Sequence, residues 1–134
     1  MYLFDTDILS NIVKRDPSYK LLDRLRELPK SVQFTSAINI GEIYFGAHRS
    51  PHKEKILAAF REKVFPNINT ISFDRGSGEV FGWLKAELEK QGIGRSEPDL
   101  RIASVTIQHN LTLITGNTKH FRSIPGLRVE NWIE

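Results

Sequence analysis

The chain has 134 residues, of which 40% are hydrophobic and 26% charged, and its 19 Lys and Arg against 16 Asp and Glu give a formal net charge of +3. This length fits one domain with its own core, and the composition excludes a disordered chain. The lack of cysteine excludes disulfide scaffolds, thiolate zinc sites, iron–sulfur clusters and cysteine nucleophiles. No apolar run is long enough for a membrane span.

The charge and the N-terminal run indicate where such a protein would act. A mild positive excess is compatible with an anionic partner such as nucleic acid, but a solvated basic surface explains it equally well. The apolar run at the start reaches an acid at Asp5, which is not the pattern of a signal peptide. We therefore expect a cytoplasmic protein that does not contact a membrane.

Short apolar runs alternate along the chain with segments of helical periodicity. The first half predicts strands at 2–4 and 32–35, helices at 8–14, 18–28 and 52–65, and between them a helix capped by Ser36. The second half predicts a strand at 70–73, a helix at 77–91, a helix with Pro98 in its first turn, and strands at 111–115 and 127–132. This alternation is typical of an α/β domain, here spanning 1–134, with a mainly parallel central sheet flanked by helices. Trp83, Trp132 and the eight phenylalanines are expected in its core.

Acidic and amide side chains follow several of these strands. In a parallel sheet the functional site lies beyond the carboxyl ends of the strands. Asp5 comes directly after the first strand, and Asn117 lies just beyond the strand at 111–115. Glu42 lies within about two helical turns of the second strand's end. Asp99 lies in the first turn of its helix, which enters from a loop at the same edge.

Each acid has a structural explanation when it is taken alone. Asp5 or Asp7 can cap a helix, Glu42 can sit half-exposed at a helix edge, and Asp99 suits the positive end of a helix dipole. Taken together, carboxylates from three segments at one sheet edge repel each other unless a cation lies among them. Oxygen ligands without His or Cys favour Mg²⁺ or Mn²⁺, and ions held in this way hydrolyse phosphodiesters.

Four blocks of the sequence match a known family in order. They are residues 2–7 (YLFDTD), 35–38 (TSAI) leading to 41–47 (GEIYFGA), 98–103 (PDLRIA) and 111–121 (LTLITGNTKHF). With these blocks the chain resembles PIN-domain ribonucleases, specifically the VapC-like toxins of type II toxin–antitoxin pairs. The resemblance covers essentially the whole chain, including its ending at 125–132, and implies a single PIN-like domain.

The resemblance implies a metal-binding role for the three acids that the sheet-edge argument selected. Asp5, Glu42 and Asp99 would bind Mg²⁺, for which Mn²⁺ can substitute, and Thr6 and Thr115 would supply hydroxyl groups beside them. The implied reaction is endonucleolytic cleavage of RNA, with metal-activated water attacking phosphorus and leaving 5′-phosphate and 3′-hydroxyl ends.

One position departs from the family pattern. The fourth catalytic position falls on Asn117, where many members have Asp, so the number of bound metal ions is left open. Asp7 stands where the family often has Asn, and it either adds a charge near the site or caps the helix. Glu97, beside Asp99, either reaches the metal or caps its helix.

The resemblance also implies macromolecular partners. Arg95, Arg101 and Lys119 are the candidates for positioning the RNA backbone, since the two arginines flank Asp99 and Lys119 follows the loop that holds Asn117. The family usually forms homodimers and is silenced by a cognate antitoxin protein. Apolar residues of the first helical hairpin serve as candidates for the antitoxin contact or, equally, as core: Ile12, Val13, Leu21 and Leu25.

Two other functions remain open from the sequence. A haloacid-dehalogenase-type phosphatase would use Asp5 as nucleophile and Asp7 as acid, but it leaves Glu42 and Asp99 without a role. A catalytically silent PIN-like module would bind RNA or a protein partner without cutting, which Asn117 favours. Retention of the acids argues against silent binding, because a carboxylate cluster without metal repels the RNA backbone.

Overall fold

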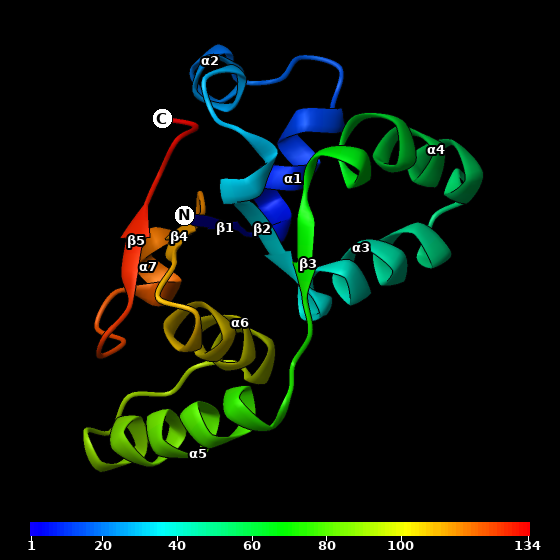
Figure 1. Ribbon diagram of the computed structural model, residues 1–134. Helices are drawn as coiled ribbons and strands as arrows, with labels where there is room; N and C mark the ends of the chain where they lie inside the picture. Colours follow the sequence, from blue (N-terminus) through cyan, green and yellow to red (C-terminus); the bar gives the residue numbers. More distant parts are fainter.

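A five-stranded sheet runs through the centre of the computed structural model, which describes all residues, 1–134 (Figure 1). The strand order is β3-β2-β1-β4-β5, and every neighbouring pair is parallel. The strands are β1 (Tyr2–Phe4), β2 (Gln33–Ser36), β3 (Asn69–Ile71), β4 (Thr112–Ile114) and β5 (Arg128–Glu130). The predicted α/β class with a parallel central sheet is confirmed.

Helices connect the strands and cover the sheet. They are α1 (Thr6–Val13), α2 (Tyr19–Arg26), α3 (Ala37–Arg49), α4 (Lys53–Lys63), α5 (Arg75–Lys90), α6 (Glu97–Gln108) and α7 (Thr118–Phe121), with single 3₁₀ turns at Lys30–Val32 and Phe65–Asn67. Ser36 caps α3 as predicted, whereas α5 begins earlier than expected because Asp74 caps it. The four-residue helix α7 was not predicted, since so short a segment shows no helical periodicity.

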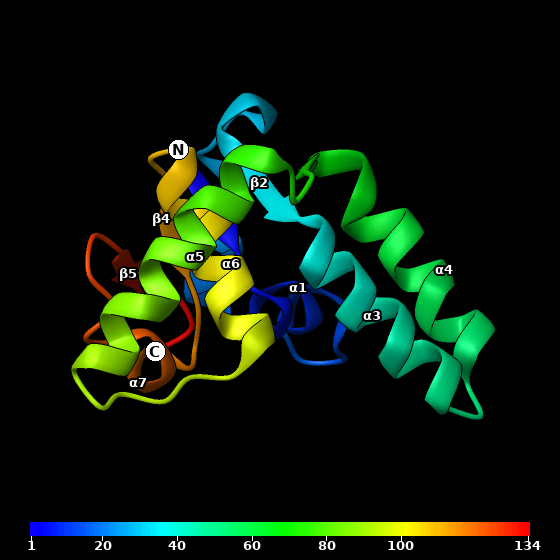
Figure 2. The ribbon, with the colours of Figure 1, turned by 90° about the horizontal axis from the view of Figure 1, so that it is seen from below.

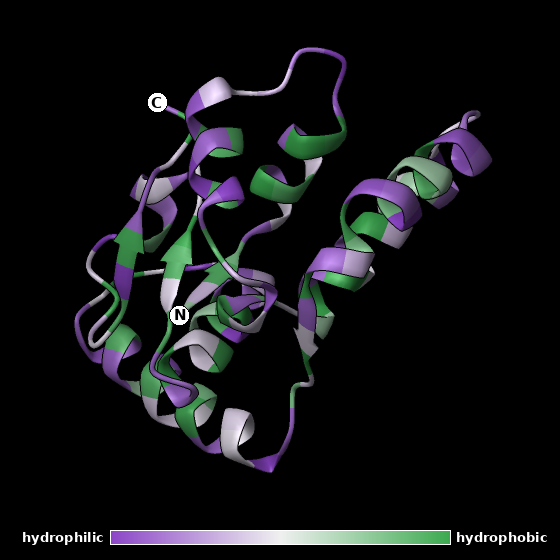
Figure 3. Ribbon diagram, turned by 45° about the horizontal axis from the view of Figure 1, so that its top comes forward, coloured by the Kyte–Doolittle hydropathy of each residue, from purple (hydrophilic) through white to green (hydrophobic).

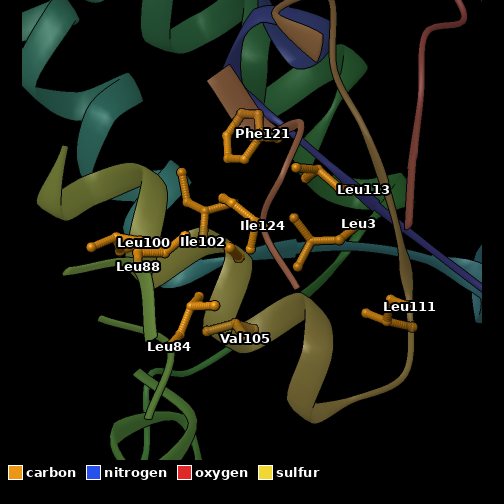
Figure 4. Packing of buried hydrophobic residues seen from close by; sticks show 11 residues of the cluster. Leu3, Leu84, Leu88, Leu100, Ile102, Val105, Leu111, Leu113, Phe121 and Ile124 are labelled. Atoms are coloured by element: carbon orange, nitrogen blue, oxygen red, sulfur yellow. The ribbon is translucent and has the colours of Figure 1, made fainter. Parts of the chain in front are cut away.

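Alternating side chains of the inner strands fill two cores. Leu3 and Leu113 pack with α5 and α6 on one face, in the cluster that Figure 4 shows. Phe4 and Ile114 point to the other face, where residues of α1, α2, α3 and α4 cover them. Figure 3 shows the same arrangement in hydropathy, with apolar strands in the centre and helices that carry one apolar and one polar side. The result is three layers, in which the sheet is buried on both sides.

Helices α3 and α4 form a hairpin that projects from the body of the molecule (Figure 2). Phe45 on α3 is 62% exposed, and Trp83 on α5 is 51% exposed. The expectation that Trp83 and all eight phenylalanines belong to the core is therefore wrong for Trp83 and Phe45. Leu84, the neighbour of Trp83, is fully buried, and successive residues on a helix point about 100° apart, so the burial of Leu84 turns Trp83 outward.

The C-terminal segment closes the second core. Trp132 is 2% exposed, as predicted, and its ring lies 4.7 Å from that of Tyr2 and 5.6 Å from that of Phe4, both edge-on. The Arg24 guanidinium of α2 lies 4.0 Å from the same ring. This contact ties α2 to the end of the chain. None of the helices is both long and apolar enough to cross a membrane.

Candidate active site

Asp5 lies at the carboxyl end of β1 and caps α1. Its Oδ1 accepts hydrogen bonds from the Thr6 backbone N–H (2.8 Å) and from Asn39 Nδ2 (3.1 Å), and its Oδ2 accepts one from the Thr115 hydroxyl (2.8 Å). The side chain is nearly inaccessible, and this burial raises the pKa of Asp5 to about 6, against the opposing effect of the Thr115 hydrogen bond. Neighbouring negative charges add to the rise. Asp5 is thus both a helix cap and a carboxyl group whose ionisation is disfavoured by burial.

Glu42 joins Asp5 through the Thr6 side chain. The Thr6 hydroxyl donates to Glu42 Oε1 at 2.6 Å and accepts from Asn39 Nδ2 at 3.0 Å. The negative charge of Glu42 is close enough to Asp5 to contribute to the rise in the pKa of Asp5. Thr6 therefore holds the carboxylate of Glu42 beside that of Asp5, in agreement with the predicted placement of its hydroxyl near the acids.

Asn39 was missed in the sequence, although it is central to this network. It is fully buried, and its Nδ2 donates to both Asp5 and Thr6. Its Oδ1 accepts from the Ser36 hydroxyl at 2.6 Å, which fixes the orientation of the amide. The available signal was its place three residues after the predicted cap Ser36, where a side chain can return to the cap and complete a capping box.

The segment after β4 approaches Asp5 and Asp7. The Thr115 hydroxyl donates to Asp5, and Asp7 Oδ2 accepts from the Gly116 backbone N–H at 2.8 Å and from Asn117 Nδ2 at 3.4 Å. Burial raises the pKa of Asp7 as well. A Cβ atom at Gly116 would lie 2.7 Å from Asp7 Oδ2, so this approach requires glycine. Asn117 therefore lies beside an acid, and that acid is Asp7.

Asp99 lies in the first turn of α6, where Ser96 caps its backbone N–H. Its carboxylate is 3.7 Å from His120 Nδ1 of α7, and no hydrogen bond joins it to Asp5 or Glu42. No three His, Asp or Glu side chains converge closely enough to hold a metal ion. The structure thus brings Asp5 and Glu42 together and places Asp99 in a separate pair with His120. That all three acids bind one ion stays a prediction.

The predicted RNA-positioning residues differ in their surroundings. Arg95 and Lys119 line a polar pocket beside Asp99. Arg101 does not line it; its guanidinium lies 5.7 Å from the ring of Phe81. Ser96, and not Glu97, caps α6, and Glu97 pairs with Lys85 at 2.7 Å on the surface.

An apolar groove of about 370 Å³ opens on the other side of the sheet, between α1, α2 and the end of α4. Ile12 and Leu25 line it, and their contact with an antitoxin stays a prediction. Leu21 does not, since it is fully buried in the second core, and Val13 packs against that core without lining the groove.

Comparison with known proteins identifies this arrangement. The model of the PIN domain family matches residues 2–127. Ribonuclease VapC2 of Haemophilus influenzae is 31% identical over 98% of both chains, and the tRNA(fMet)-specific endonuclease VapC of Shigella flexneri is 28% identical over 98% of this chain and 97% of its own.

Solved structures agree with this sequence match. VapBC2 of Rickettsia felis, crystallised with a DNA fragment from its promoter, superposes with a TM-score of 0.89 at 31% identity over 98% of both chains. DNA-bound VapBC of Salmonella typhimurium gives a TM-score of 0.90 at 27% identity over 98% of this chain and 97% of its own. The chain belongs to the PIN-domain family, in its VapC branch.

Proposed function

We propose that the chain is a metal-dependent endoribonuclease and the toxin of a toxin–antitoxin module acting on cytoplasmic RNA. The observation that carries the proposal is the hydrogen-bonded network that holds Asp5 and Glu42 side by side at the carboxyl ends of the parallel strands. It is supported by relatives named as ribonucleases along nearly the whole chain. The phosphatase alternative is abandoned, because the chain belongs to a different family.

The carboxylate oxygens of the site are suitable ligands for a hard divalent cation such as Mg²⁺, with Mn²⁺ as a substitute. Asp5, Glu42 and Asp99 would hold it through carboxylate oxygens, the ligands that these ions prefer. When bound, the ion supplies activation of water and stabilisation of the leaving oxygen. The buried network fits this role because Asp5 has only uncharged hydrogen-bond donors, which orient its oxygens without neutralising them.

The chain's own residues prepare this site in two ways. Asn39 and Thr115 each bind a different oxygen of Asp5, so the carboxylate is fixed in rotation before any ligand arrives. Thr6 does the same for Glu42. Such fixed geometry lowers the cost of assembling the reactive arrangement. Asn117, which the family resemblance puts at the fourth catalytic position, offers an amide, and the carboxylate of Asp7 lies next to it.

The partner proposed for the apolar groove is the cognate antitoxin. The similar solved structures from Rickettsia felis and Salmonella typhimurium are toxin–antitoxin complexes. Eight of the thirteen residues that line the groove are hydrophobic, while Arg26, Lys30 and Lys63 stand among the others. This composition suits an amphipathic segment with an apolar face and acidic flanks. A homodimer of the chain stays a prediction from the family resemblance.

The test is cleavage by the chain purified without antitoxin. Total RNA is incubated with Mg²⁺ or with EDTA, and the new RNA ends are mapped by their terminal chemistry. The first defined substrate is tRNA(fMet), which the name of the Shigella flexneri relative gives as its target. We expect discrete cleavage by wild type in Mg²⁺, a loss of at least about 100-fold in Asp5→Asn and Asp99→Asn, and full activity in Lys55→Gln, an exposed charge on α4. Folded wild type that binds RNA in EDTA but never cuts it would favour the silent binding module instead.

A further inference from the structure

A polar pocket of about 350 Å³ lies between the start of α6 and the helix α7. It is lined only by Gly94, Arg95, Ser96, Asp99, Lys119 and His120, none of them hydrophobic. Figure 2 shows the loop from α5 to α6 running past α7, which brings the two sides of the pocket together. We call it the α6–α7 pocket. Its position beside Asp99 places it next to the proposed active site.

Positive charge dominates the α6–α7 pocket. Arg95 and Lys119 bring two positive charges to the pocket, and its single carboxylate, that of Asp99, lies 3.7 Å from His120 Nδ1. No ion pair engages Lys119. The pocket also lies at the N-terminal end of the twelve-residue helix α6, the positive end of its dipole. A pocket of this composition selects an anion.

Arg95 holds the two walls of the pocket together. Its Nη1 donates to the Gly94 carbonyl at 2.7 Å and its Nη2 to the Arg122 carbonyl, just after α7, at 3.0 Å. Its Nε is buried and has no hydrogen-bond partner in the protein. A buried donor without a partner lowers the free energy of unfolding, so this bridging position of Arg95 reduces the stability of the fold. It fixes Lys119 and His120 of α7 relative to Asp99 of α6.

We propose that the α6–α7 pocket binds one backbone phosphate of the RNA beside the bond to be cut, with Lys119 and His120 as its contacts. The inference rests on the proposed function and adds two residues to it: it makes His120 a substrate contact and gives Lys119 a defined ligand. A phosphate matches the site because it is compact, anionic and rich in acceptor oxygens, while the pocket offers an ammonium group, an imidazole and no apolar wall. Such a contact sets the register of the strand without reading its sequence.

The experiment measures binding without cleavage. Asp5→Asn protein is titrated with a short fluorescein-labelled polyuridine strand in EDTA at several salt concentrations, and fluorescence anisotropy gives the affinity. Lys119→Gln and His120→Gln are added to this background, with Lys55→Gln as the matched control. We expect Lys119→Gln to weaken binding about tenfold and to reduce the slope of log affinity against log salt by about 0.7, the value for one phosphate contact on a single strand. His120→Gln weakens binding, and Lys55→Gln changes neither quantity.

The outcomes separate this inference from the proposed function. If Lys119→Gln and His120→Gln bind like Lys55→Gln, the phosphate subsite is wrong, even where wild type cleaves RNA in Mg²⁺. An affinity loss with an unchanged salt slope in Lys119→Gln would assign that residue a structural role and also overturn the subsite. If wild type cuts no RNA while the slope still falls in Lys119→Gln, the subsite stands and the nuclease proposal fails.

Discussion

Replacing Asp5 by Asn is expected to stabilise the fold at neutral and alkaline pH while abolishing cleavage. Burial raises the pKa of Asp5 from 3.8 to about 6 in the folded chain. The unfolded chain ionises this group more readily, so the folded state binds more protons between these two values. The free energy of unfolding therefore falls as pH rises through this range and levels off above it.

The magnitude follows from the two pKa values. A difference between 3.8 and about 6 corresponds to about 3 kcal/mol of stability lost at pH 8 relative to strongly acidic solution, most of it between pH 4 and pH 8. Asn is nearly isosteric with the protonated acid and never ionises. Its amide nitrogen meets the Thr115 hydroxyl, which can accept as well as donate. We expect Asp5→Asn to gain about 1–3 kcal/mol at pH 8, or about 4–12 °C in Tm, and almost nothing at pH 4.

The assay is urea unfolding followed by circular dichroism, for wild type and Asp5→Asn at pH 4, 6 and 8 in EDTA. The matched control is Asp16→Asn, an exposed acid without a hydrogen bond or ion pair, which should follow the wild-type profile. Asp7 also has a raised pKa and titrates in both proteins, so the informative quantity is the difference between the two profiles. An Asp5→Asn protein that is less stable than wild type at pH 8, or equally pH-dependent, would refute the assignment of a buried carboxylate with a raised pKa.

Two further substitutions test the other parts of the structure. Thr6→Val removes the hydroxyl between Asn39 and Glu42. We expect the free energy of unfolding, measured in urea, to fall by about 1–2 kcal/mol and the cleavage rate to fall as well. Unchanged stability and activity would show that the hydroxyl does not organise the site. Leu25→Ala shortens a side chain of the apolar groove and should weaken the affinity for the antitoxin about tenfold, while the free chain still cuts RNA. Equal antitoxin affinity would show that the antitoxin binds elsewhere.

The sequence was sufficient for the fold because its signals are local. The runs at Tyr2–Phe4 and Thr112–Ile114 are too short and too apolar for surface helices, and the intervening helical periodicity requires parallel connections. The same logic placed Asp5 at a strand end, where it is found. Glu42 was placed only approximately by the helical rise, and the structure adds the contact through Thr6 that joins it to Asp5.

The sequence could not supply contacts that depend on how helices are oriented. Asn39 reaches Asp5 only because α3 starts at the end of β2, beside β1. Its spacing from Ser36 could predict a capping box, but not the contact with Asp5. The pairing of His120 with Asp99 depends on a four-residue helix that leaves no periodicity. Two roles were left open for Asp7, a helix cap or a charge near the site; Asp5 is the cap of α1, and Asp7 instead accepts a hydrogen bond from the Gly116 backbone N–H, a tertiary contact.

Two helix caps of this chain show how burial changes the ionisation of a capping carboxylate. Asp74 and Asp5 both cap a helix and accept hydrogen bonds from a backbone N–H and from a hydroxyl. At exposed Asp74 the hydrogen bond from Gln108 and those of the cap lower the pKa. At Asp5 similar uncharged donors are outweighed by burial, and the pKa rises to about 6. Hydrogen bonds thus do not offset the burial of Asp5, and no Lys or Arg pairs with it. A cation bound beside the carboxylate, as in the proposed nuclease, would lower this pKa and favour the ionised form.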